Sequence, residues 1–148
     1  MKASVLSAAF KMFMLCLVVS NSAQARDDVG EYSIADAMSL EKAKEALGTD
    51  IKFYFGNQAH PKPQKNYGEF STNKKTSAFG KSDKAACDWV FLSAMIALRD
   101  RALREGGNAV VNIKSNYKGN LTVSDDTYQC GAGAVMAGVA LVGTVIKM

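Results

Sequence analysis

Apolar residues at helical spacing mark the stretch from Asp83 to Glu105. This stretch contains no glycine or proline, and most of its residues favour a helix. Ser82 or Asp83 is a suitable N-cap, and Gly106-Gly107 supplies a stop, because glycine adopts the left-handed conformation without steric cost. The sequence therefore predicts one long helix with two neighbouring apolar stripes, namely Ala85, Trp89, Leu92, Ile96 and Leu103, and Phe91, Met95, Leu98 and Ala102.

A helix that is apolar nearly all round needs cover on more than one side. One sheet covers only one side, so we expect a second surface to meet the other. The excess apolar area favours an envelope protein partner or a second copy of the chain. The candidate partner face consists of Trp89, Phe91, Met95 and Leu98.

Strand patterns follow and precede this helix. Residues 109–115 alternate, with Ala109, Val111 and Ile113 on one face, which is typical of a half-exposed antiparallel strand. Residues 51–55 alternate and are aromatic, which also favours a strand.

Two further segments complete the predicted fold. The glycine-rich run 131–146 is apolar on both alternating faces, which predicts a central strand covered on both sides and bent at a glycine. Residues 39–47 predict a short helix with a serine cap, ended by Gly48. The predicted fold class is α+β, with an antiparallel sheet packed against one long helix.

The first 25 residues have the pattern of a secretory signal peptide. Lys2 and Lys11 are followed by a short uncharged apolar run, and Ala23-Gln24-Ala25 is a small-x-small cleavage site. The run is short for a bilayer span, which needs roughly 20 residues. We therefore expect cleavage after Ala25, a periplasmic or secreted location, and no transmembrane segment afterwards.

Removing residues 1–25, which hold two lysines and no acidic residue, lowers the net charge from +4 to +2. Residues 26–148 have a length that suits a single domain. Within it, residues 26–81 supply a strand, a short helix and a basic loop, and residues 82–148 supply the helix and strands of the core.

Two cysteines remain after the predicted cleavage, Cys87 and Cys130. In an exported protein an even pair favours a disulfide, which would connect the first turn of the long helix to a late strand. The alternative is functional, because a thiol at a helix N-terminus has a lowered pKa and raised reactivity. The pair then belongs to a thiol-based redox or metal-responsive protein.

Residues 57–84 are the least regular part and hold both prolines and the only histidine, His60. Aromatic residues are interleaved with lysines, a pattern that also occurs on nucleic-acid or anionic-lipid surfaces. The small net charge instead favours a solvated loop or hairpin with an exposed lysine edge, and no nucleic-acid partner. The candidate basic surface consists of Lys62, Lys65, Lys74, Lys75 and Lys81.

Catalytic and cofactor motifs are incomplete in this sequence. Gly80-Lys81-Ser82 resembles the end of a phosphate loop, but Lys75 stands where that motif needs its first glycine. His60 has no second ligand at metal spacing. No nucleophile and base pattern stands out, so we expect no enzyme activity, no cofactor and no metal.

From Lys84 to Met148, a long helix ends in Gly-Gly-Asn-Ala-Val-Val-Asn-Ile, a polar hairpin follows, and the run Ala-Val-Met-Ala-Gly-Val-Ala-Leu comes after it. This pattern resembles the small α+β domain of the YbjQ family and the related domain of RcsF-like outer-membrane stress-sensing lipoproteins. Gly107 replaces the usual alanine. The resemblance implies an α+β fold, and disulfide-forming cysteines of the RcsF kind agree in type with Cys87 and Cys130.

The chain also resembles small exported bacterial proteins named excinuclease ATPase subunit. That name implies nucleotide-dependent DNA repair, and nucleotide binding is the third hypothesis. The incomplete phosphate loop argues against it. The function that the residues favour is an exported, non-enzymatic, envelope-associated binding or accessory protein, with the thiol-based alternative second.

Overall fold

The computed structural model describes residues 26–148, so the predicted signal peptide over residues 1–25 lies outside the described residues. The described chain contains seven strands and three helices. In chain order they are β1 (Asp28–Ser33), α1 (Ile34–Ser39), α2 (Glu41–Leu47), β2 (Lys52–Phe55), β3 (Lys65–Ser77), α3 (Asp83–Glu105), β4 (Ala109–Tyr117), β5 (Asn120–Thr122), β6 (Thr127–Ala132) and β7 (Met136–Lys147).

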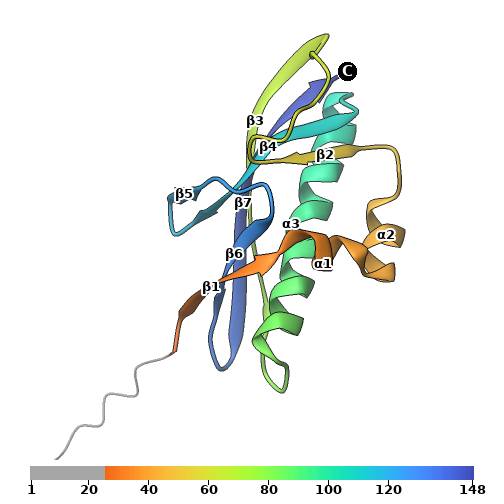
Figure 1. The fold of residues 1–148 in the computed structure, drawn as a ribbon. Helices are drawn as coiled ribbons and strands as arrows, with labels where there is room; N and C mark the ends of the chain where they lie inside the picture. The colour runs from red at the N-terminus through yellow and green to blue at the C-terminus, as the bar shows by residue number, and fades with distance from the viewer. Residues whose placement is uncertain (1–25) are drawn as a thin grey trace, which may run out of the picture.

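The strands form one curled sheet, and α3 runs along one of its faces with α1 and α2 beside it (Figure 1). The order is β1-β6-β7-β4-β2, with β3 paired to the other side of β7 and β5 paired to β4. The prediction of an α+β fold with one long packed helix is confirmed. The sheet is mixed rather than antiparallel, because β2 pairs in parallel with β4. A parallel neighbour requires a crossover, which β3 and α3 supply.

Helix α3 has the bounds that its sequence predicts. The Ser82 hydroxyl accepts a hydrogen bond from the Ala85 backbone amide at 3.2 Å and caps the first turn. Gly106 ends the helix in the left-handed conformation, with a φ of 81°.

The N-terminal helical region differs from the prediction of one helix with a serine cap at residue 39. It contains two short helices that meet at Leu40, which is the N-cap of α2 and offers no side-chain cap. The serine cap lies earlier, where the Ser33 hydroxyl accepts from the Asp36 amide at 3.1 Å. Gly48 ends α2 as predicted.

Strand β3 corrects the interpretation of residues 57–84 as loop or short hairpin. It pairs with β7 from Lys65↔Lys147 to Ser77↔Met136 and is an edge strand of the described sheet. Polar side chains dominate β3, so its alternation carries no apolar signal. Its pairing with the long apolar strand β7 makes it a strand instead, so tertiary context overrides local propensity here.

A bulge at Asn112 corrects the predicted faces of β4. Asn112 has a φ of 52°, and the register with β7 shifts between Val111 and Lys114. As a result Ile113 joins Val110 in the main core, whereas Ala109 and Val111 pack in a separate small cluster. One extra residue has moved Ile113 to the opposite face of the sheet from Ala109 and Val111.

Strand β7 is central, as predicted, since it pairs with β3, β4 and β6. Its side chains alternate between two environments. Those facing α3 belong to the main core, and the aromatic rings of Phe91 and Tyr128 stack there with centroids 4.1 Å apart. On the other face Ala140, Val142 and Ile146 are also buried, so the strand is largely covered on both sides as predicted, and Ile146 packs there with Ala109 and Val111 in a small second cluster.

Candidate functional site

The predicted cysteine pair forms a disulfide that connects α3 to β6. Both residues are 0% exposed. A second connection lies beside it, because the Tyr128 hydroxyl donates to Asp88 Oδ1 at 2.8 Å, and Lys84 pairs with the other Asp88 oxygen at 3.0 Å. Burial and this contact with Asp88 raise the pKa of the Tyr128 phenol. This region ties the helix to the sheet.

The predicted partner face on α3 needs a correction. Phe91, Met95 and Leu98 are almost wholly buried against the sheet, so they form core rather than an exposed face. Of this predicted face only Trp89 is half exposed, and the Lys42 ammonium lies 4.4 Å from the centre of its ring. The first stripe is divided between two environments, since Leu92 is buried in the main core and Ile96 packs against it, whereas Trp89 and Leu103 are about half exposed.

The five lysines of the predicted basic surface do not form one patch. Lys65 pairs in register with Lys147 at one end of β7, whereas Lys75 pairs with Gly138 near the other end. Lys74 borders a polar groove between β3 and α3 that also contains Arg101 and Arg104. The remaining members lie in loops on either side of β3, namely Lys62 and Lys81.

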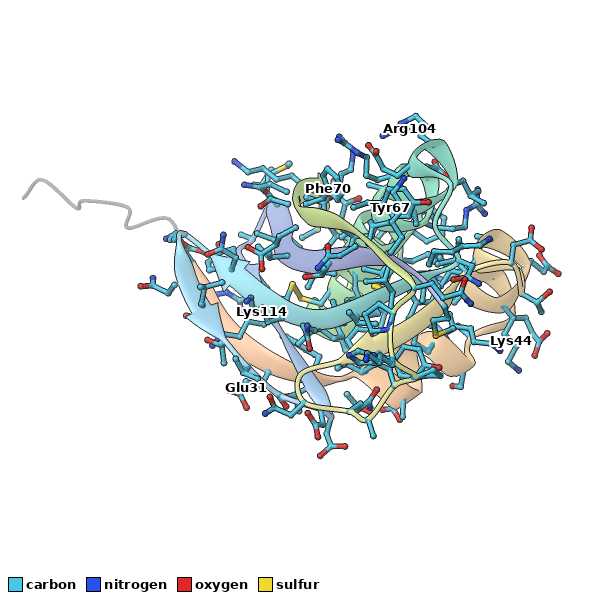
Figure 2. The ribbon with its side chains drawn as sticks, turned by 90° about the horizontal axis from the view of Figure 1, so that it is seen from above. Glu31, Lys44, Tyr67, Phe70, Arg104 and Lys114 are labelled. Atoms are coloured by element: carbon cyan, nitrogen blue, oxygen red, sulfur yellow. A yellow bond between two sulfur atoms is a disulfide. The ribbon has the colours of Figure 1, made fainter. Side chains whose placement is uncertain are left out.

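That groove lies at the C-terminal end of α3, where Arg104 stands close to Tyr67 and Phe70 of β3 (Figure 2). The Arg101 guanidinium lies 3.8 Å from the centre of the Phe70 ring and also pairs with Glu105 at 2.7 Å. The Tyr67 hydroxyl donates to the Gly106 carbonyl at 3.3 Å. These contacts hold the edge strand β3 against the helix.

The segment that resembles a phosphate loop serves as the cap of α3. Ser82 is the N-cap, and the Lys81 ammonium donates to the Ser77 carbonyl at 3.0 Å. Strand β3 leads into this loop and ends at Ser77. Within residues 26–148 no group of three metal-ligating side chains comes together.

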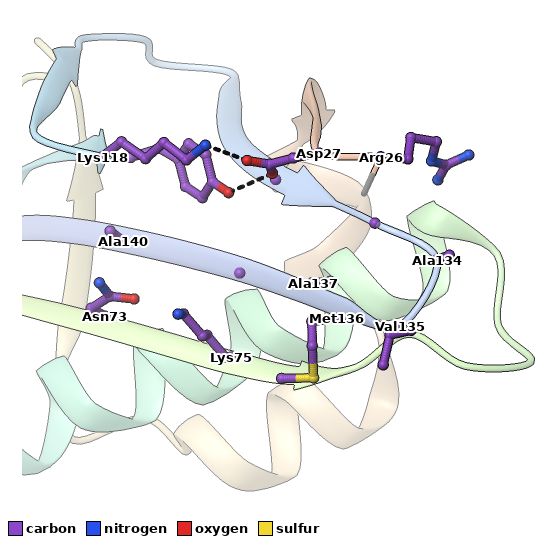
Figure 3. A pocket seen from close by; sticks show the side chains of 14 residues that line it. Arg26, Asp27, Asn73, Lys75, Lys118, Ala134, Val135, Met136, Ala137 and Ala140 are labelled. Carbon is purple, nitrogen blue, oxygen red and sulfur yellow. Dashed lines mark hydrogen bonds and ion pairs between the residues drawn. The ribbon is translucent and has the colours of Figure 1, made fainter. Parts of the chain in front are cut away.

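A cavity of about 650 Å³ lies on the sheet face opposite α3. Its floor is made of small residues, and Figure 3 shows β7 running beneath it between Lys118 and Asp27 on one side and Asn73 and Lys75 on the other. The floor consists of Gly131, Gly138 and Ala140, and the exposed Ala134 stands at the mouth.

The phenol ring of Tyr117 lies directly over this glycine floor. A methyl group added at Gly131 would come within 2.2 Å of the ring carbon that carries the hydroxyl. At Gly138 the ring and two atoms of the neighbouring strand stay at 3.6–3.7 Å, which is ordinary contact distance. Glycine at residue 131 is therefore what lets the aromatic ring lie flat on the strand.

One wall of the cavity carries an ion pair. The Tyr117 hydroxyl donates to Asp27 Oδ1 at 2.9 Å, and the Lys118 ammonium pairs with Asp27 Oδ2 (Figure 3). Lys118 first, and Tyr117 second, lower the pKa of the Asp27 carboxyl. Lys118 stands here because it occupies a two-residue hairpin turn with Gly119, both with positive φ.

The opposite wall carries a cation without an ion pair. Among the described residues no acidic side chain lies within pairing distance of Lys75. Arg26 also lines the cavity, but its guanidinium is paired with Asp83 at 2.6 Å and with Asp28 at 3.1 Å. Lys75 is thus the cation that a bound anion meets without competing for an existing partner.

Chemically, the cavity offers an apolar floor, an aromatic ring and a positive edge. Such a site holds an apolar group by burial and orients it through one charged contact. The sequence signals that bear on it are the glycines of the terminal run, which indicate close backbone approach, and Lys75. Reasoning from sequence missed Tyr117, Asp27 and Lys118, because only the fold brings these three together.

No protein-family model, curated protein or solved structure matches this chain. The resemblance to YbjQ and RcsF-like domains therefore stays a prediction. Within residues 26–148, none of the helices has the length and apolar character needed to cross a bilayer.

Proposed function

We propose that this protein is an exported, non-enzymatic binding protein of the cell envelope, and that its sheet-face cavity holds an amphiphile with an apolar chain and an anionic head. The observation that carries this proposal is the combination of a floor of small residues beneath Tyr117 with the unpaired Lys75 at the edge. Burial of a chain on the floor supplies affinity, and the ammonium of Lys75 selects the head group.

Two observations support the proposed export to the periplasm or beyond. The disulfide Cys87–Cys130 is of a kind that persists in oxidising compartments. The pattern of residues 1–25 predicts delivery there. The alternative thiol-based function has less support, because both sulfur atoms belong to fully buried residues that solutes do not reach.

The test is calorimetric titration with dodecyl phosphate and, as an uncharged comparison, dodecyl maltoside, both below their micelle-forming concentrations. We expect the wild-type protein to bind dodecyl phosphate more tightly than dodecyl maltoside. Lys75→Gln is expected to weaken phosphate binding about tenfold and to leave maltoside binding unchanged. Lys52→Gln, at the end of the sheet far from the cavity, is the matched control.

Two further variants test the floor and the mouth. Ala140→Leu fills the floor, and Ala134→Trp narrows the mouth at an exposed position, so both are expected to reduce binding of either detergent. Circular dichroism confirms that each variant is folded. Equal affinity of wild-type, Lys75→Gln and Ala134→Trp for dodecyl phosphate would contradict the proposal.

A further inference from the structure

Two loops that are far apart in sequence meet at one end of the molecule. Strands β3 and β7 end together at the pair Ser77↔Met136, and both the β3–α3 loop and the β6–β7 turn project beyond it (Figure 1). The Ala78 amide donates to the Val135 carbonyl at 2.7 Å and joins the two loops. We call this end, made of residues 78–81 and 133–136, the apolar tip.

Large apolar side chains are unusually exposed at the apolar tip. Phe79 is 79% exposed, Val135 62% and Met136 47%. An isolated exposed apolar side chain needs no explanation, but three at the ends of two joined loops form a patch. The described part of the chain packs nothing over them.

Two lysines lie beside this patch. Lys81 follows Phe79 in the same loop, and Lys75 stands two residues before the end of β3. Neither lies in an ion pair among the described residues, whereas the nearby acidic side chain Asp83 is already paired with Arg26. The local field of the tip is therefore positive, although the chain as a whole carries little net charge.

We propose that the apolar tip docks onto the surface of an anionic phospholipid bilayer. Phe79, Val135 and Met136 enter the boundary between head groups and acyl chains, while Lys75 and Lys81 contact the phosphates. Apolar side chains at the end of a rigid element, flanked by cations, match the layered polarity of that boundary. Binding to a protein partner would not require apolar side chains at the tip with lysines beside them.

Phe79 and Lys81 do not line the cavity, so variants at these two residues test docking separately from ligand binding, whereas Lys75 takes part in both proposals. Docking has a consequence for the cavity nonetheless. Val135 and Met136 belong to both the tip and the cavity lining, so docking turns one end of the cavity toward the bilayer. An amphiphile then passes between bilayer and cavity without crossing bulk water.

The experiment is sedimentation of the protein with vesicles of phosphatidylglycerol and phosphatidylcholine, compared with vesicles of phosphatidylcholine alone. The protein is purified after export, and mass spectrometry establishes its N-terminus. We expect binding to the anionic vesicles that weakens with added salt. Phe79→Ser is expected to reduce the partition coefficient about tenfold.

Matched controls keep the result interpretable. Leu121 is 59% exposed in the β4–β5 hairpin, so Leu121→Ser removes a comparable exposed side chain away from the tip and is expected to leave binding unchanged. Lys81→Gln is expected to weaken binding to anionic vesicles, and Lys52→Gln is not. Dodecyl phosphate affinity, measured in parallel, should stay at the wild-type value in Phe79→Ser.

Three results would overturn the proposal. One is equal binding of wild-type and Phe79→Ser to anionic vesicles, and another is equal binding of the wild-type protein to neutral and anionic vesicles. The third is absence of vesicle binding together with self-association that Phe79→Ser abolishes, which would assign the tip to a contact between two copies. If Phe79→Ser loses vesicle binding but still binds dodecyl phosphate, the docking proposal is tested separately from the cavity proposal.

Discussion

The two faces of strand β7 come from the same short segment but have different roles, one in the core and one at the cavity. Toward α3 it presents Val139 and Leu141, which are buried in the main core. Toward the other side it presents Gly138 and Ala140, which form the floor of an open cavity. Alternation along a strand separates the two sets completely, since neighbouring side chains point to opposite faces.

This difference indicates which face of the sheet contributes more to the stability of the fold. The helix face has large side chains, a disulfide and a buried hydrogen bond between Tyr128 and Asp88. Around the cavity, the opposite face has small residues, the Tyr117 ring and one exposed ion pair. We therefore expect changes on the helix face to alter folding, and changes on the cavity face to alter binding.

Removal of the disulfide should give the largest effect. The double variant Cys87→Ala/Cys130→Ala opens a cross-link between residues 43 apart in sequence. The loop-entropy relation predicts a loss of about 4 kcal/mol in the free energy of unfolding. Urea denaturation measures it, with each single Ala variant as a control for the lost side chains. A loss below about 1 kcal/mol would show that packing alone holds α3 to the sheet.

A pair of glycine substitutions on β7 compares the faces most directly. A methyl group at Gly143 would stand 2.6 Å from Val110 Cγ1 in the core, so Gly143→Ala should destabilise by about 1–3 kcal/mol. At Gly138 the nearest atom stays at 3.6 Å, so Gly138→Ala should stabilise slightly, by less than about 1 kcal/mol. Thermal unfolding ranks the two, and the opposite ranking would refute the assignment of the faces.

Replacement of Tyr128 by phenylalanine should have a smaller effect that depends on pH. Loss of its hydrogen bond to Asp88 should cost about 1 kcal/mol at neutral pH. The folded protein raises the pKa of Tyr128, so the stabilisation is full below the unfolded-state pKa of about 10 and declines as the pH rises above it.

Chemical denaturation between pH 8 and 11 tests this linkage. The stability of the wild-type protein should fall over that range more steeply than that of Tyr128→Phe. Tyr54→Phe, at a tyrosine that lies outside the main core, is the control. If the free energy of unfolding falls equally with pH in wild-type and Tyr128→Phe, ionisation of Tyr128 does not oppose folding.

Neutralising Asp27 should change stability least. Its carboxyl is exposed at the cavity wall, and its lowered pKa means that its contribution is present above pH about 4 and is lost as the pH falls through the folded-state value. Asp27→Asn should leave the urea midpoint at pH 7 nearly unchanged. It should instead tighten dodecyl phosphate binding, because Lys118 loses its partner, and Asp50→Asn serves as a control.

Much of the helix face was predictable from sequence. The bounds of α3, the Ser82 cap, the stop at Gly106 and the pairing of Cys87 with Cys130 all follow from local rules about helix ends and cysteine parity. The helix ends follow from signals that act within one turn, and the disulfide follows because only two cysteines remain after the predicted cleavage.

The rest depends on partners that a local pattern does not reveal. The strand from Lys65 to Ser77 is polar, and only pairing with β7 makes it a strand. The parallel pairing of β2 and the bulge at Asn112 are properties of the register between strands. The cavity combines Lys75, Tyr117 and Asp27, which lie in three separate parts of the chain, so no spacing rule could have joined them.

The burial of the disulfide has a consequence for the route by which the protein matures. Both sulfur atoms are shielded once α3 rests on β6, so an oxidant reaches the thiols only while that contact is open. Oxidation therefore has to occur before or during closure of the core. A chain that folds first in a reducing compartment would retain two protected thiols, and later transfer to an oxidising one would not convert them without partial unfolding.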